Sequence, residues 1–280
     1  MLSPNNQKLI SKYNDLKDLL IILDYLNNLD NLTKFKNIKA TITKETTPNL
    51  DNVKEMYQNL FKVKKVYYSP SKPSIFRIIR KKTYDKLELT SPFNIPITYN
   101  YQNDLFKNSV EFNFPLQKLS NVPVIKSINL TPSSITDIIY IHEITHTQYN
   151  SRDNSIYSEL LPIFMEKFTE DYLNNNNNML YLRLNDLYNN ILKLKTNIFP
   201  NDELSEHIKF DSIKYIESTL QAYMLYHIYK NEPLSSLKAR IIDDIQSVLN
   251  ENKTINNLLS KYDITSENSK NLTLFKAYFK

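Results

Sequence analysis

The chain has 280 residues, 41% hydrophobic and 23% charged, which is a composition typical of globular proteins. It contains no cysteine and no glycine, which excludes disulfides, thiolate metal sites and glycine-rich phosphate loops. The formal net charge is +5, but the basic residues form only short clusters and no stripe suited to nucleic acid. No run is apolar for long enough to cross a membrane, and the first thirty residues lack the pattern of a signal peptide. We therefore expect a cytoplasmic protein that binds neither nucleic acid nor a membrane.

The first quarter of the chain has apolar residues at helical spacing. They recur every three or four positions from Leu9 to Leu23, and the pattern returns from Asp51 to Phe61. From about residue 66 to residue 129 the chain changes to short β-branched and aromatic runs, separated by proline and asparagine, which favour strands. We predict a helical region over 1–65 and a small antiparallel sheet over 66–130.

The remaining region, 131–280, returns to helical patterns. The asparagine run from Asn174 to Asn178 predicts a loop between two of the helices. The sequence therefore predicts a predominantly helical α+β protein, folded as one compact unit, in which a C-terminal helical bundle follows the sheet. Helices are expected near 134–149, 156–173, 179–195, 212–230, 235–250 and 254–262.

A His-Glu-x-x-His motif runs from His142 to His146, in a segment whose turn-like start predicts a helix beginning at Ser133 or Ser134. On a helix, residues four apart lie on one face, so the two imidazoles can bind a single zinc ion. Glu143 lies about 100° further round the helix, where it can accept a proton from zinc-bound water. The motif therefore predicts a hydrolytic zinc site.

A third zinc ligand is needed, and a carboxylate is expected because no third histidine is close in sequence. Glu166 follows His146 by 20 residues, as in thermolysin-like enzymes, and Glu170 one turn later could then orient a histidine. Glu159 follows by only 13 residues. If two antiparallel helices meet across the short loop 150–154, however, the position opposite His146 is close to Glu159. This geometry favours Glu159, with Glu166 as the alternative ligand.

These residues resemble the oligoendopeptidase F-like metallopeptidases, a branch of the thimet oligopeptidase clan of zinc gluzincins. In that family the ligand glutamate opens a stretch with an aromatic residue and a second glutamate, the order of Glu159, Phe164 and Glu166 here. The segment Val122 to Asp137 is similar to the family's strand and acidic turn before the motif helix. The gap after the motif is shorter than in the family, and Ile144 replaces its glycine. The chain thus resembles a reduced and divergent member.

The resemblance extends to the downstream residues His207 and Tyr215, whose order and spacing are similar to a histidine and a tyrosine of the family. It implies that Tyr215, with His207 second, donates a hydrogen bond to the oxyanion that forms during hydrolysis. The alternatives are a core position for Tyr215 and a surface position for His207. His227 lies in an apolar helical stretch and is interpreted as a packing residue.

The sequence therefore predicts a zinc metallopeptidase with His142, His146 and Glu159 as ligands and Glu143 as general base; the resemblance implies short, unfolded peptide substrates. The strand at Val122 to Ile128 is expected to offer an open edge to an extended peptide. Two alternatives remain. One is a zinc protease or hydrolase that acts on a specific protein or a non-peptide amide, and the other is a non-catalytic helical binding protein with a vestigial motif.

Overall fold

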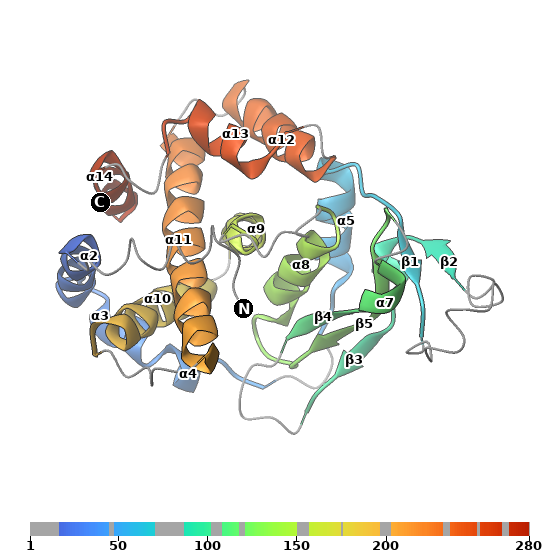
Figure 1. Cartoon of the computed structure of the whole chain (residues 1–280), viewed down its shortest axis with the longest axis horizontal. Coiled ribbons are helices and arrows are strands. Elements are labelled where there is room, and N and C mark those ends of the chain that lie inside the picture. Colours follow the sequence, from blue (N-terminus) through green and yellow to red (C-terminus); the bar gives the residue numbers. More distant parts are fainter. Residues whose placement is uncertain are drawn as a thin grey trace. The chain divides into compact units, whose positions relative to one another are not determined.

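A computed structural model describes residues 17–44, 48–70, 87–101, 108–117, 121–149, 157–174, 176–196, 203–231, 236–250, 253–264 and 269–279. Leu9 to Leu16 of the predicted first helix, the β-like run at 74–80 and the loop 150–154 lie outside these residues. Figure 1 shows N-terminal helices, a small sheet and a C-terminal helical bundle, which confirms the predicted α+β class. No helix in the described part of the chain is both long and apolar enough to span a bilayer.

The chain divides into two compact units. The first comprises Met1–Ile42, Ser151–Ile241 and Lys253–Lys280, and the second comprises Thr43–Asn150 and Ile242–Asn252. The division into three sequence regions stays a prediction.

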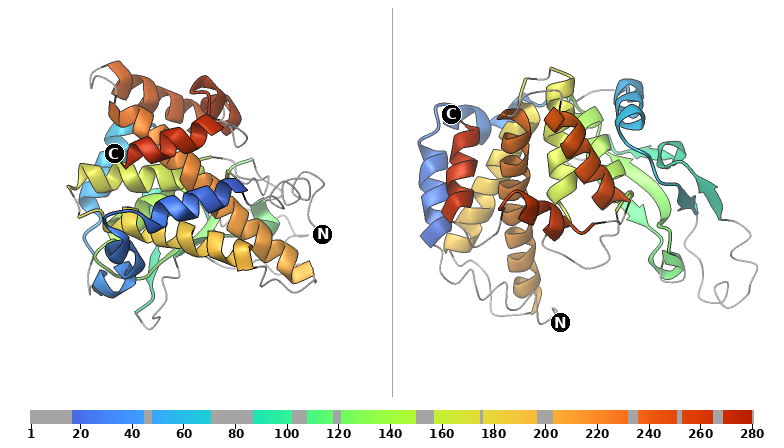
Figure 2. Two further views of the ribbon diagram at one scale, coloured as in Figure 1. Left: turned by 90° about the vertical axis from the view of Figure 1, so that its left-hand side faces the viewer. Right: turned by 90° about the horizontal axis from the view of Figure 1, so that it is seen from above.

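The first unit is helical. Its longest helix, α11, packs against α9, α10 and α14. From opposite ends of the chain, α2 and α14 lie side by side, with the Tyr25 ring 6.4 Å from that of Phe275 and 6.2 Å from that of Phe279 (Figure 2). The helices are α2 (Lys17–Asn27), α3 (Leu32–Lys36), α4 (Ile38–Thr41), α9 (Leu160–Tyr172), α10 (Asn178–Thr196), α11 (Glu203–Asn231), α13 (Ile255–Lys261) and α14 (Ser269–Tyr278). Helix α12 (Ser236–Leu249) contributes residues to both units.

The second unit consists of a five-stranded sheet and the helices around it. Helix α8 packs against α5 and against strands β4 and β5. Its elements are α5 (Asp51–Leu60), β1 (Val66–Tyr68), β2 (Glu88–Thr90), η2 (Pro92–Asn94), β3 (Ile97–Tyr99), β4 (Ser109–Phe112), α7 (Phe114–Gln117), β5 (Val124–Leu130) and α8 (Thr136–His146).

The sheet is mixed, whereas the sequence pattern predicted an antiparallel one. Strand β5 runs parallel to β1 and β3 and antiparallel to β4, and β1 is antiparallel to β2. Parallel pairing requires a long crossover, and the segments that join β1 and β3 to β5 are long enough to provide it. Short β-branched runs indicate that strands exist, but they carry no information on strand direction.

The prediction of an open edge on β5 is wrong. One edge of β5 pairs with β1 near Val124 and with β3 near Ile128. The other edge pairs with β4, where Val110 faces Ile128. Among the described strands β2, β3 and β4 each pair with one neighbour, so an additional strand could extend the outer edge of β4.

Candidate metal centre

Helix α8 begins at Thr136, later than the predicted start at Ser133 or Ser134. The backbone of the two serines is already engaged with residues outside the helix. Ser133 forms a β-bridge with Lys44, and the backbone N–H of Ser134 donates to the Thr43 carbonyl at 2.9 Å. A turn over Ser134 and Ile135, in which the backbone N–H of Thr136 donates to the Ser133 carbonyl at 3.0 Å, leads into the helix, and no serine side chain caps it.

Helix α8 is buried around its whole circumference. All residues from Ile138 to Thr145 are buried, including His142 and Glu143, which are each 6% exposed. A helix buried on every side belongs to a core, where a charged or polar side chain is costly unless it has partners. His142 and Glu143 therefore lie where packing alone would favour apolar side chains.

The structure brings His142 and His146 together on one face of α8. Their Nε2 atoms are 3.0 Å apart, and the ring planes cross at 74°. Zinc binds imidazole nitrogen at about 2.0–2.1 Å, so two nitrogens on one ion are separated by about 3.3–3.4 Å at the tetrahedral angle and by about 3.0 Å at an angle near 95°. The observed separation of the two nitrogens fits binding to a single ion.

Glu159 completes a group that could hold a metal ion. Ligand atoms of His142, His146 and Glu159 all lie within 4.8 Å of one another. His142 and Glu159 are buried, and His146 is half-buried. Two imidazoles and one carboxylate are a ligand set found in catalytic zinc sites. In the described part of the chain this is the one such group of three side chains.

Glu159 occupies the N-cap position of α9, where its side chain is 9% exposed. Lys214, on α11, places its Nζ atom 3.5 Å from Glu159 Oε1. The same ammonium lies 3.7 Å from Asp211 Oδ1 and 4.9 Å from the centre of the Tyr215 ring. A cation thus stands beside the carboxylate of the candidate metal group.

Glu166, the alternative ligand, forms a two-point ion pair with Arg183 on α10. The Nε atom of Arg183 donates to Glu166 Oε2 at 2.7 Å, and its second guanidinium nitrogen donates to Oε1. Burial alone would lower the pKa of Arg183, but the charge and hydrogen bonds of Glu166 raise it well above its ordinary value. Glu166 is 1% exposed, and this pair ties α9 to α10. Whether Glu159 or Glu166 binds the ion stays a prediction.

Glu170 caps the start of α10. Its Oε1 atom accepts hydrogen bonds from the backbone N–H groups of Met179 at 2.7 Å and Leu180 at 3.4 Å. Its Oε2 atom accepts from Lys167 Nζ at 3.3 Å. Within the described residues the suggested contact of Glu170 with a histidine is not formed. The carboxylate instead satisfies N–H groups that have no acceptor inside the helix.

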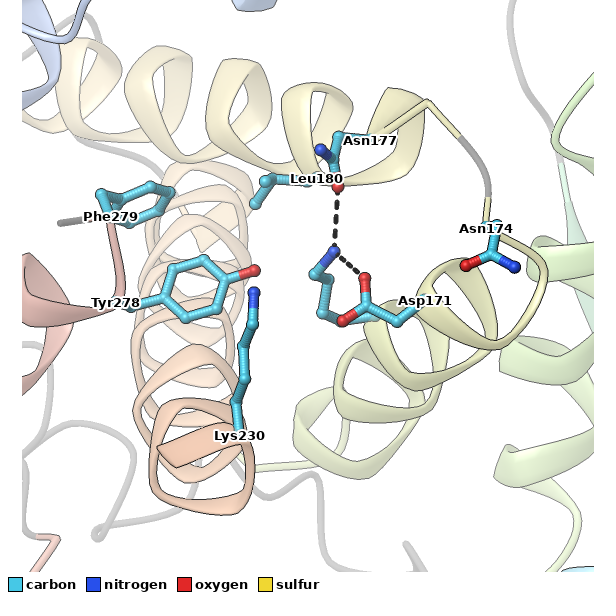
Figure 3. Close-up of a pocket in the computed structure, with 8 residues that line it drawn as sticks. Asp171, Asn174, Asn177, Leu180, Lys230, Tyr278 and Phe279 are labelled. Carbon is cyan, nitrogen blue, oxygen red and sulfur yellow. Dashed lines mark hydrogen bonds and ion pairs between the residues drawn. The ribbon is translucent and has the colours of Figure 1, made fainter. Parts of the chain in front are cut away.

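The same network forms one wall of a cavity of about 460 Å³ (Figure 3). Lys167 also donates to Asp171 Oδ1 at 2.5 Å and to Asn177 Oδ1 at 3.1 Å. The three protons of its ammonium are therefore used by acceptors of the chain itself. The cluster fixes the connection between α9 and α10, with Asn177 in a left-handed conformation at φ 56°. The lining residues are Lys167, Asp171, Asn174, Asn177, Leu180, Lys230, Tyr278 and Phe279.

This network makes a prediction about stability. We expect Glu170→Ala to lower the free energy of unfolding by about 3 kcal/mol, because the buried ammonium of Lys167 loses one of its three acceptors and two backbone N–H groups lose theirs. Burial raises the pKa of Glu170 above 4.5, although Lys167 and the start of α10 act against this rise. A raised pKa means that the native state binds the proton more tightly than the unfolded chain does. The titration of Glu170 therefore contributes stability below pH 4.5, and this contribution is lost as the pH rises through the raised pKa.

Denaturant titrations of the wild type and of Glu170→Gln between pH 4 and pH 7 measure this contribution as a difference in unfolding free energy. The difference should shrink as the pH rises, because the glutamine does not titrate. Glu55→Gln is the matched control, since Glu55 is exposed on α5 and should leave the pH profile unchanged. A difference that grows with pH would show that the carboxylate form of Glu170 is the one that the fold favours.

Tyr215 and His207 both lie on α11. Tyr215 is half-buried beside Lys214, whereas His207 is exposed. Their separation of eight positions corresponds to about 12 Å along the helix axis. His227 is half-buried on the same helix, with its ring 6.5 Å from that of Tyr278, and burial followed by the charge of Lys230 lowers its pKa. The oxyanion roles of Tyr215 and His207 stay predictions.

Sequence reasoning missed two residues beside the candidate ligands, Lys214 and Arg183. Arg183 carried a signal, because it interrupts an apolar pattern in a predicted helix and so requires an acidic partner. Lys214 carried none, since a lysine at a half-buried helical position is ordinary. Comparisons of the chain with protein-family models, with curated proteins and with solved structures gave no match.

Proposed function

We propose that the protein is a zinc-dependent metallopeptidase that hydrolyses short, unfolded peptides. The observation that carries this proposal is the group of His142, His146 and Glu159 around one point, with the buried carboxylate of Glu143 on the same helix as the histidines. Zinc suits this set because it binds imidazole nitrogen and carboxylate oxygen, and three protein ligands leave the fourth position of a tetrahedral site for the reaction.

The residues of α8 divide the chemistry between them. His142 and His146, with Glu159, would hold the ion; when bound, it would act as a Lewis acid that polarises a peptide carbonyl and makes water more acidic. Glu143 follows His142 directly, so its carboxylate is turned by about 100° around α8 and is not used as a ligand. Glu143 accepts the proton of the attacking water and returns it to the departing amine. Its burial favours this role, because electrostatic interactions between neighbouring groups are stronger in a low dielectric.

Strand β4 supports binding of an extended peptide. Its outer edge is unpaired among the described strands, and α8, which carries the two histidines, packs against the strand. A peptide that adds to this edge would form main-chain hydrogen bonds, which depend little on the side chains of the substrate. This arrangement favours a peptidase with broad sequence tolerance.

A peptide-library assay tests the proposed function. Zinc-loaded protein should cleave unstructured peptides, with products identified by mass spectrometry, and a chelator should stop cleavage until zinc is restored. A panel of folded proteins in the same assay should remain intact. Cleavage of one folded protein and of no peptide would favour a targeted protease. Absence of hydrolysis with zinc bound would favour a binding protein.

Tyr215 provides a further prediction within this function. Tyr215→Phe should lower kcat by about 10- to 1000-fold with little change in KM, because the hydroxyl is proposed to donate to the oxyanion and not to the ground-state carbonyl. Bound zinc and unfolding free energy should stay near the wild-type values, since the ring still packs. His207→Ala is the companion variant, and it tests the second candidate for the same role. Full activity of Tyr215→Phe would show that the hydroxyl is not needed and would favour a packing role for Tyr215.

A further inference from the structure

We propose that Lys214 is a positioning residue that competes with the metal ion for Glu159 and moves toward Asp211 when the ion binds. Lys214 and Asp211 lie on α11, and Glu159 lies at the start of α9. This role depends on the metal site of the proposed function and concerns the way in which that site gains and loses its ion.

The distances show that the ammonium is shared. Lys214 Nζ lies 3.5 Å from Glu159 Oε1 and 3.7 Å from Asp211 Oδ1, and both distances are longer than a normal N–H···O hydrogen bond. The ammonium is therefore held by charge between two carboxylates and is locked to neither. A small rotation of the lysine side chain is enough to favour one acceptor over the other.

The two acceptors differ in their surroundings. The side chain of Glu159 is 9% exposed, whereas that of Asp211 is 63% exposed. A buried carboxylate is costly without a positive partner, so in the metal-free protein the ammonium of Lys214 stabilises Glu159. Water already solvates Asp211, which makes Asp211 a place to which the ammonium can move at little cost.

A metal ion on Glu159 replaces the lysine as its positive partner. Two cations beside one partly buried carboxylate repel each other, and the side chain of Lys214 is itself only 18% exposed, so solvent screens this repulsion weakly. The ion must therefore displace Lys214 toward Asp211, and the work of this displacement weakens metal binding. Lys214 therefore stabilises the site in the metal-free protein and makes the bound ion easier to release.

The test is a pair of measurements on the full chain with Lys214→Met. Competition with a chromophoric chelator should show zinc bound about 10- to 100-fold more tightly than by the wild type, because the competing charge is gone. Thermal unfolding of the metal-free variant should occur at a lower temperature than in the metal-free wild type, since Glu159 has lost the positive charge of Lys214. If Lys214 only stabilised the fold, Lys214→Met would lower both the zinc affinity and the unfolding temperature.

Two further variants sharpen the result. Asp211→Asn removes the negative charge of the second partner at an exposed position and should weaken zinc binding about 2- to 5-fold, because Glu159 is then the one carboxylate that attracts Lys214 at this distance. Lys230→Met removes the same charge from α11, about 24 Å farther along the helix, and should leave the affinity unchanged. Unchanged or weaker zinc binding by Lys214→Met would overturn this inference while the proposed function stands. If the wild type bound no zinc at all, both this inference and the proposed function would be wrong.

Discussion

Glu143→Gln is expected to lower the rate of peptide hydrolysis by three orders of magnitude or more while leaving zinc bound and the fold intact. Glutamine has nearly the shape of glutamate, so α8 should pack as before, and neither His142 nor His146 is altered. The substitution removes the group that accepts the proton of water and returns it to the amine. The measurements are kcat/KM on a cleaved peptide, zinc per chain and the circular dichroism spectrum.

Asp137→Asn is the matched control for Glu143→Gln. Asp137 lies in the first turn of the same helix, and burial raises its pKa. Its loss should change hydrolysis by less than about 3-fold, because it lies more than one turn from the ligands. Hydrolysis by Glu143→Gln at a rate close to the wild type would show that another base serves this reaction.

Glu159→Ala and Glu166→Ala are expected to have opposite effects. Glu159→Ala should weaken zinc binding at least 100-fold, since even the loss of a group that only orients a ligand costs about 10- to 100-fold. Glu166→Ala should leave zinc affinity near the wild-type value but lower the free energy of unfolding by about 3 kcal/mol, because the mostly buried guanidinium of Arg183 loses its two-point partner and keeps the longer contact with Asp186. Chelator competition and denaturant unfolding of both variants measure the two effects.

A double variant distinguishes loss of the ion pair from loss of a ligand. Glu166→Leu combined with Arg183→Met replaces the buried charges by apolar side chains and should recover much of the lost stability. Zinc affinity should remain unchanged in the double variant. Weaker zinc binding by Glu166→Ala than by Glu159→Ala would contradict this assignment and make Glu166 the third ligand.

The helical part of the fold was largely predictable because apolar periodicity sets helix positions. The pattern at 179–195 predicts α10, which spans Asn178–Thr196. The start of α11 at Glu203 was missed, since its first turns carry exposed residues such as His207 and Ile208 and show no apolar stripe. Helix α14 was missed as well; its ring contacts with α2 connect residues more than 200 positions apart. Such tertiary contacts leave no periodic signal.

The candidate site was partly predictable, for a geometric reason. A spacing of four residues on a helix fixes the approach of His142 to His146, so the pair follows from the sequence. The partners of the two candidate carboxylates, Glu159 and Glu166, could not be predicted from the sequence. Arg183 lies 17 positions after Glu166, and Lys214 lies on another helix from Glu159, so only the packing of α9 against α10 and α11 brings them together. The direction of β5 relative to β1 and β3 is another property of tertiary structure.

The zinc content of the purified chain tests the central claim most directly. Protein prepared without chelator, incubated with zinc and dialysed, should contain about one zinc ion per chain by elemental analysis, and His146→Gln should contain far less. Fewer than about 0.2 zinc ions per wild-type chain, with no rise on addition of zinc, would contradict the metal site and the proposed hydrolysis with it.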